Sequence, residues 1–187
     1  MMDRKIRAHD LKLALDRFLA NVERRALIMA ELSTNSRDDA MDVVQEAMFA
    51  FARKYANKPE EEWRPLFYRV LQNKMRDWGR RTKLRKRWRI WLQEDASDGA
   101  GIDPIQLLAD PRGELPEDTL DNQAAMRRLL RTIKALPTRQ REALLLRVWE
   151  GMDVAETAKA MGCTSGSVKT HLFRGLSKLR ETLDIER

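Results

Sequence analysis

The sequence has only one cysteine, two histidines and no long apolar run. Cys163 alone can form no internal disulfide and no thiolate zinc cluster, and we expect it to be a small buried thiol. His9 and His171 lie too far apart in the chain to suggest a metal site. No apolar stretch approaches the ~18 residues of a membrane-spanning helix, and the N-terminal segment MMDRKIRAHD lacks the apolar core of a signal peptide. These absences predict a cytoplasmic protein without membrane insertion, metal or other cofactor.

Strand-like alternation is also missing, whereas apolar residues recur throughout at helical spacing. The 187 residues are enough for one or two domains, and the net charge of +7 favours a polyanionic partner. Helices are predicted over 9–32, over about 37–56, and from Trp63 toward Trp91, where Gly79 could interrupt the last one. In the first of these helices the residues expected to face the core are Leu11, Leu15, Phe18, Leu19, Val22, Ala26 and Met29. In the second they are Met41, Val44, Met48, Phe51 and Tyr55, and in the third Leu66, Phe67, Val70, Leu71 and Met75.

A change of composition separates this unit from a second one. Between positions 93 and 121, nine residues are acidic and only Arg112 is basic, and six glycines and prolines interrupt the segment. Further helices are expected near 120–133 and over 139–150, the latter with Leu144, Leu145 and Val148 facing inward. We therefore predict an all-α protein of two helical domains, 1–92 and 119–187, joined by a flexible acidic linker over 93–118.

The segment from Asp153 to Arg180 is predicted to form a helix-turn-helix. Asp153 and Glu156 match a capping box that starts the first helix, and Gly162 allows the positive φ of a sharp turn. Thr164 can then cap a second helix. The apolar stripe of that helix is Val168, Leu172, Leu176, Leu179 and Leu183.

The opposite side of this second helix is small, polar and basic. No residue between Thr164 and Arg180 is acidic, whereas Lys169, Arg174 and Lys178 are basic. Such a face suits the DNA major groove, where Phe173 could meet a thymine methyl group. The alternative is an ordinary helical hairpin with a solvated basic face. The face and its edges comprise Gly166, Ser167, Lys169, Thr170, His171, Phe173, Arg174 and Ser177.

The third predicted helix is strongly basic and rich in tryptophan. Positions 76–89 hold eight basic residues and one acidic residue, and Trp63, Trp78, Trp88 and Trp91 are interleaved with them or close by. Basic side chains engage phosphates, and aromatic rings stack on unpaired bases, so this pattern indicates partly single-stranded nucleic acid. The alternative is a solvated run of charge with tryptophans in the core.

The second predicted helix carries an acidic outer face. Asp39, Asp42 and Glu46 lie on it with Arg53, and two apolar residues that we place off the core stripe, Val43 and Phe49, flank it. Apolar residues beside carboxylates suggest a surface for another protein. Two alternatives are a merely solvated acidic face and a carboxylate metal site at Asp38, Asp42 and Glu46.

Three segments together resemble bacterial RNA polymerase sigma factors of the extracytoplasmic-function subfamily. They are DAMDVVQE at 39–46, WRPLFYRVLQNKMRDWGRR at 63–81, and the stretch from Leu136-Pro137 to Arg180. Two positions depart from the family pattern, His171 where arginine is common and Gly175 where alanine is common. The resemblance implies a polymerase subunit that directs promoter recognition, DNA melting and initiation of a stress or envelope-response regulon, without catalysis of its own.

The resemblance also implies partners and residue roles. The chain would bind core RNA polymerase through the clamp helices of the β′ subunit. It would bind promoter DNA at the −10 and −35 elements. An anti-sigma factor would keep the free protein inactive. The residues implied for polymerase binding are Asp39, Asp42, Gln45 and Glu46, with the flanking Val43 and Phe49. Those implied for the −10 element are a base-capturing loop with Asn57, Lys58 and Trp63, followed by Arg69, Asn73, Arg76, Arg80 and Arg81. Those implied for the −35 element are Lys169, Thr170, His171, Phe173, Arg174 and Lys178, with Ser165, Gly166 and Ser167 near a phosphate.

Two other classes of protein are alternatives to a sigma factor. A helix-turn-helix regulator acting without polymerase would leave the basic tryptophan-rich helix and the acidic face without a role. A nucleic-acid enzyme would need a nucleophile or converging carboxylates, and the sequence suggests neither.

Overall fold

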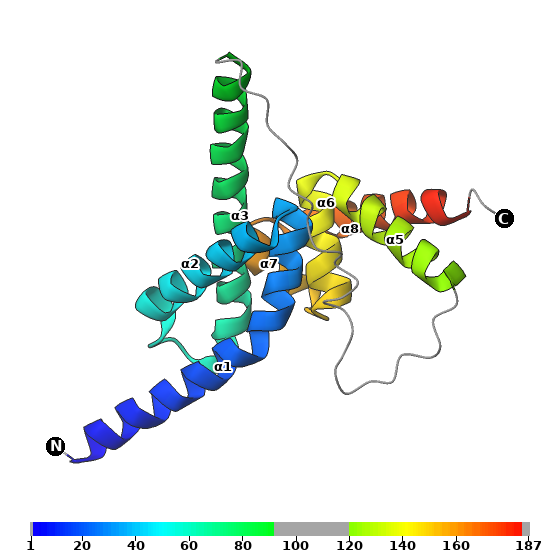
Figure 1. Ribbon diagram of the computed structural model, residues 1–187. Coiled ribbons are helices and arrows are strands. Elements are labelled where there is room, and N and C mark those ends of the chain that lie inside the picture. The colour runs from blue at the N-terminus through cyan, green and yellow to red at the C-terminus, as the bar shows by residue number, and fades with distance from the viewer. Residues whose placement is uncertain (1, 92–119, 185–187) are drawn as a thin grey trace.

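The computed structural model describes residues 2–91 and 120–184, in which every regular element is helical (Figure 1). The predicted all-α class is therefore confirmed, whereas the acidic linker predicted over 93–118 lies outside the described residues. None of the described helices is long and apolar enough to span a membrane. In chain order the elements are α1 (Met2–Thr34), α2 (Arg37–Tyr55), α3 (Glu60–Trp91), α5 (Leu120–Ala135), α6 (Thr138–Leu144), the π-helix η1 (Leu145–Trp149), α7 (Val154–Met161) and α8 (Ser165–Asp184).

Local signals explain where the N-terminal helices begin. Ser36 has extended backbone, and its side chain accepts a hydrogen bond from the Asp39 backbone N–H, which caps α2. Three glutamates, Glu60–Glu62, form the first turn of α3, where negative charge offsets the helix dipole. The interruption expected near Gly79 does not occur, and the C-terminal half of α3 projects beyond the other helices (Figure 1).

Helices α1, α2 and α3 bury an aromatic cluster between them. The ring of Phe18 lies with its centroid 5.5 Å from those of both Phe51 and Trp63, and Phe67 meets Phe51 edge-on at 5.7 Å. Edge-on and tilted contacts of this kind stabilise a core beyond the area that they bury. The predicted core residues of α1 and α3 therefore meet as expected, with Trp63 added to them.

The helix-turn-helix forms as predicted. Asp153 and Glu156 make both hydrogen bonds of the capping box at the start of α7. Gly162 ends α7 with a φ of +64°, and the Thr164 hydroxyl accepts a hydrogen bond from the Ser167 backbone N–H at the start of α8. The thiol of Cys163 is half-buried in this turn, and burial raises its pKa.

Alanine at Gly162 and alanine at Gly79 are expected to have opposite effects on the free energy of unfolding. At Gly162 a side chain must adopt the left-handed conformation, so we expect a loss of about 1 kcal/mol. At Gly79, within α3 and with no atom within 4 Å of a new Cβ, we expect a gain of ~0.5–1 kcal/mol from helix propensity. Urea unfolding followed by circular dichroism measures both, and changes of the same sign would contradict this geometry.

The π-helix η1 changes which residues of the second domain face inward. Its wider turn keeps Leu145 and Leu146 buried but leaves the Val148 side chain 64% exposed and Trp149 partly exposed. The prediction that Val148 faces inward was therefore wrong, because it assumed 3.6 residues per turn throughout.

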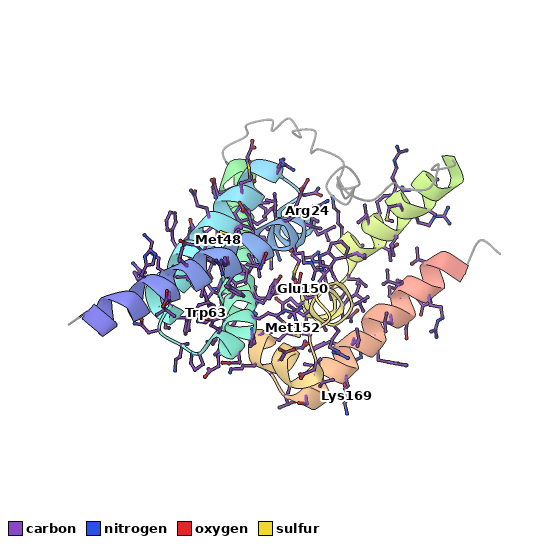
Figure 2. The ribbon with its side chains drawn as sticks, turned by 90° about the horizontal axis from the view of Figure 1, so that it is seen from below. Arg24, Met48, Trp63, Glu150, Met152 and Lys169 are labelled. Carbon is purple, nitrogen blue, oxygen red and sulfur yellow. The ribbon has the colours of Figure 1, made fainter. Side chains whose placement is uncertain are left out.

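The two groups of helices pack against each other. Helix α7 lies against α3 and α5 lies against the end of α1, and buried residues of both groups form one continuous core. Glu150 and Met152, which precede α7, lie between the groups (Figure 2). This placement was not predicted from the sequence.

Candidate nucleic-acid interface

The outward face of α8 is open to solvent. The Phe173 side chain is 71% exposed, and Lys169 lies on the side of the domain away from α1–α3 (Figure 2). The predicted −35 residues Ser165, Gly166, Lys169, Thr170, Phe173, Arg174 and Lys178 are exposed, whereas Ser167 and His171 are half-buried. On the opposite side Val168 and Leu179 are buried as predicted, but Leu176 is 41% exposed.

A groove of about 960 Å³ runs beside this face between α5, α6 and α8. Phe173, Arg174 and Lys178 line it from α8, and Arg128 and Arg131 line it from α5. The two arginines add positive charge next to the predicted DNA face, and sequence reasoning missed them because nothing in the α5 sequence reveals its position beside α8. At Gly175, where the family pattern has alanine, a Cβ would lie 3.4 Å from the backbone oxygen of Gln140, an ordinary van der Waals contact, so the packing does not explain the glycine.

A second basic surface lies on α3. Arg69, Asn73, Arg76 and Arg80 follow one another at steps of four, three and four, which places them on one face of the helix. All are exposed except Arg76, which is half-buried, and Arg81 is exposed on an adjacent face. Asn57 and Lys58 are exposed in the turn before α3. Four of the eight residues predicted for the −10 element, Arg69, Asn73, Arg76 and Arg80, therefore share one face of α3. The side chains of Trp88 and Trp91 lie outside the described residues.

Trp63 does not belong to this surface. Its side chain is 1% exposed and lies beside α1 (Figure 2). It belongs to α3 and not to the preceding turn, and its ring contacts Phe18. The prediction that it captures a base was wrong for this arrangement, because the apolar side of α3 begins at its first turn and includes position 63.

The outer face of α2 is acidic, as predicted. Asp42, Gln45 and Glu46 are exposed, Asp39 is half-buried, and the Phe49 side chain is 69% exposed. Glu46 accepts a hydrogen bond from Lys74 of α3 at 2.8 Å. The described residues bring no three potential metal-ligating carboxylate, histidine or cysteine side chains together.

Val43 was wrongly placed on this face. The buried stripe of α2 consists of Ala40, Val43, Val44, Ala47 and Phe51, so Val43 is in the core and Met41, expected there, is 45% exposed. The small alanines at 40 and 47 let α2 approach its neighbours closely, and this rotates the buried side away from the predicted one.

An exposed basic helix that follows a left-handed turn, together with a separate basic surface on α3, is typical of an all-helical DNA-binding protein of the helix-turn-helix class. Residues 126–179 match the family model for sigma-70 region 4. The RNA polymerase sigma-E factor of Streptomyces antibioticus is 31% identical over 147 residues, which cover 78% of this chain and 71% of that protein. The ECF RNA polymerase sigma factor SigD of Mycobacterium tuberculosis is 35% identical over 68 residues, 36% of this chain and 32% of that one.

The chain therefore belongs to the bacterial RNA polymerase sigma factors, in the extracytoplasmic-function subfamily. As a sigma factor, it binds core RNA polymerase and directs transcription initiation at promoters. A solved structure with a similar fold is that of the sigma factor RpoE of Bartonella quintana, in complex with the anti-sigma factor NepR. That chain is 22% identical with a TM-score of 0.55, and the match covers 98% of this chain and 99% of that one.

Proposed function

We propose that this sigma factor grips its promoter at two points. The face of α8 enters the major groove of the −35 element, and the α3 surface of Arg69, Asn73, Arg76 and Arg80 holds the backbone of the −10 element. The observation that carries this proposal is the presence of two separate basic surfaces. A regulator that only binds duplex DNA needs α8 alone and gives the α3 surface no partner.

The proposed mechanism uses binding free energy to open DNA. Arginines and Asn73 on α3 bind backbone phosphates, while Asn57 and Lys58 at the start of the helix lie where an unstacked base can be captured. Contacts made only with separated strands favour the melted state. The chain supplies no chemical step in this scheme, because polymerase forms the RNA.

We assign polymerase binding to the acidic face of α2, defined by Asp39, Asp42, Gln45, Glu46 and the exposed Phe49. In the proposed arrangement this face meets the clamp helices of the β′ subunit in the cytoplasm. Residues 1–92 form the domain for polymerase and the −10 element, residues 119–187 the domain for the −35 element, and 93–118 the linker. An anti-sigma factor is a further proposed partner, by analogy with the complex of RpoE and NepR.

A run-off transcription assay tests the proposed function. Core polymerase of the same bacterium is incubated with the chain and a library of genomic promoter fragments. We expect transcripts from a subset of fragments that core polymerase alone does not produce. If no fragment responds, the proposed two-point grip is wrong.

Arg174→Ala is expected to weaken −35 binding by ~1–3 kcal/mol, because an arginine at a base edge discriminates among base pairs by about this amount. Selection from a randomised duplex library, followed by sequencing, should show relaxed preference at one or two positions. Arg17→Ala is the matched control, since it removes the same charge from an exposed position of α1, outside the predicted −35 face. Unchanged base preference in Arg174→Ala would remove this residue from the interface.

A further inference from the structure

The face of α3 next to the −10 surface is covered by the second domain. Arg64, Tyr68, Gln72 and Arg76 recur at steps of four, and this stripe faces α7, Glu142 of α6 and Glu150. Tyr68 and Gln72 are buried, and burial, followed by the nearby Glu150 carboxylate, raises the pKa of the Tyr68 hydroxyl. Arg76 belongs to both this stripe and the proposed −10 surface.

Two buried carboxylates of the second domain pair with arginines of the first. The Glu142 side chain is 4% exposed and accepts a hydrogen bond from Arg76 Nε at 2.9 Å, while Arg139 of its own domain lies at 3.2 Å. The Glu150 side chain is 2% exposed, and its Oε2 lies 3.7 Å from Arg64 and 3.8 Å from Arg25. Arg64 also donates to the backbone carbonyl of Glu150.

We propose that this contact is an intramolecular docking surface that competes with promoter DNA for α3. The Glu142 carboxylate holds the Arg76 guanidinium as a DNA phosphate would, because both are anionic acceptors for the same N–H groups. The chain's own helix-turn-helix domain is thus the partner of this surface when DNA is absent. The inference rests on the proposed function, in which Arg76 binds the −10 element.

The packed arrangement cannot hold both promoter elements at once. Helix α7 lies directly on α3, and α8, whose 20 residues span ~30 Å, follows after a short turn. Elements at −10 and −35 are centred roughly 25 base pairs apart, or ~85 Å of duplex at 3.4 Å per base pair. The two domains must therefore separate before the two-point grip can form.

The interface is polar enough to open. Both amide atoms of Gln72 and the Oε1 atom of Glu150 are buried without a hydrogen-bond partner among the described residues. The Oε2 atom of Glu150 is ion-paired with Arg25 and Arg64. At the rim, Lys159 of α7 pairs with Glu62 of α3 at 3.3 Å, and their side chains are 45% and 39% exposed. Buried ion pairs regain hydration when they separate, so they fix which surfaces meet more than they strengthen the contact.

A reversible cross-link across the rim tests the competition. Glu62→Cys and Lys159→Cys are combined in a Cys163→Ser chain and bridged by a short, thiol-cleavable bismaleimide. We expect the bridged chain to lose at least nine-tenths of its run-off transcription with core polymerase, and the cleaved chain to recover it. Chains with one of the two cysteines carry the same reagent without a bridge and control for modification.

The outcomes separate this inference from the proposed function. If bridged and cleaved chains are equally active, the domains need not part, which overturns both the inference and the two-point grip. If the bridged chain is inactive but opening the contact does not tighten DNA binding, the inference alone is overturned. If neither chain nor the unmodified protein initiates transcription, the proposed function fails and the inference falls with it.

A second test opens the contact without touching a proposed DNA-binding residue. Glu142→Gln removes the charge that holds Arg76, so we expect lower energy transfer between dyes at Arg17→Cys and Arg180→Cys in the Cys163→Ser chain. Binding to a labelled single strand of mixed sequence should tighten roughly three- to tenfold, in proportion to the open fraction. Glu23→Gln, which removes one exposed charge from α1, should change neither. Unchanged energy transfer, or opening without tighter binding, contradicts the inference.

Discussion

Trp63→Ala is expected to lower the free energy of unfolding by about 3–5 kcal/mol, the range for truncating a large aromatic side chain in a packed core. The ring fills the space between α1 and α3, where it contacts Phe18, and no other side chain can replace that volume. Global unfolding in urea, followed by circular dichroism, measures the change. A loss of this size is a substantial part of the stability of a domain.

Two further variants distinguish a core role from a surface role. Trp63→Phe keeps most of the apolar volume and removes an indole N–H that has no acceptor among the described residues, so we expect a loss below ~1.5 kcal/mol. Phe173→Ala, at an exposed position of α8, should change stability by less than ~0.5 kcal/mol but weaken −35 binding. If Trp63→Ala left stability unchanged and weakened only −10 binding, position 63 would belong to the DNA surface.

The sequence predicted helices and their ends well where local chemistry decides them. Ser36, Asp153, Gly162 and Thr164 act through their own backbone and their near neighbours, so each can be identified without knowledge of the fold. The exposed face of α8 was equally predictable from the sequence, because only one side of that helix is apolar enough to be buried.

The buried side of α2 was less certain, because its sequence contains two overlapping stripes. Met41, Val44 and Met48 make one, and Ala40, Val43 and Ala47 make another, rotated slightly around the helix. Larger apolar side chains favour the first on hydrophobicity alone. Close approach to α1 and α3 favours the second, since alanines allow helix backbones to pack tightly, and this requirement depends on neighbours that a single helix does not reveal.

The contact between the domains depends on residues far apart in the sequence and was not predicted. One signal was available: Glu142 and Glu150 lie four residues before and after Leu146, so they share the side of that buried leucine. A carboxylate at an apolar position predicts a partner of opposite charge. Many arginines in this basic chain could supply it, and only the structure identifies Arg25, Arg64 and Arg76.

Asp42→Ala combined with Glu46→Ala is expected to weaken binding to core polymerase by ~2–4 kcal/mol, roughly 30- to 700-fold. Both carboxylates point into solvent from the α2 face, beside the exposed Phe49, so a basic partner surface can reach them. The fold should be little affected, because the one described ion pair that is lost, Glu46–Lys74, is exposed and contributes at most ~1 kcal/mol. Interferometry with immobilised core polymerase measures the affinity.

The matched control for this double variant is Asp16→Ala combined with Glu23→Ala, which removes the same charge from exposed positions of α1. If both double variants weaken binding equally, attraction between net charges explains the effect and α2 is no specific contact. If only the α2 variant weakens binding and the association rate falls less steeply with added salt than in the wild type, its carboxylates meet basic groups directly. Unaltered affinity would place the polymerase contact on another face of the first domain, with Phe49 left as an isolated exposed ring.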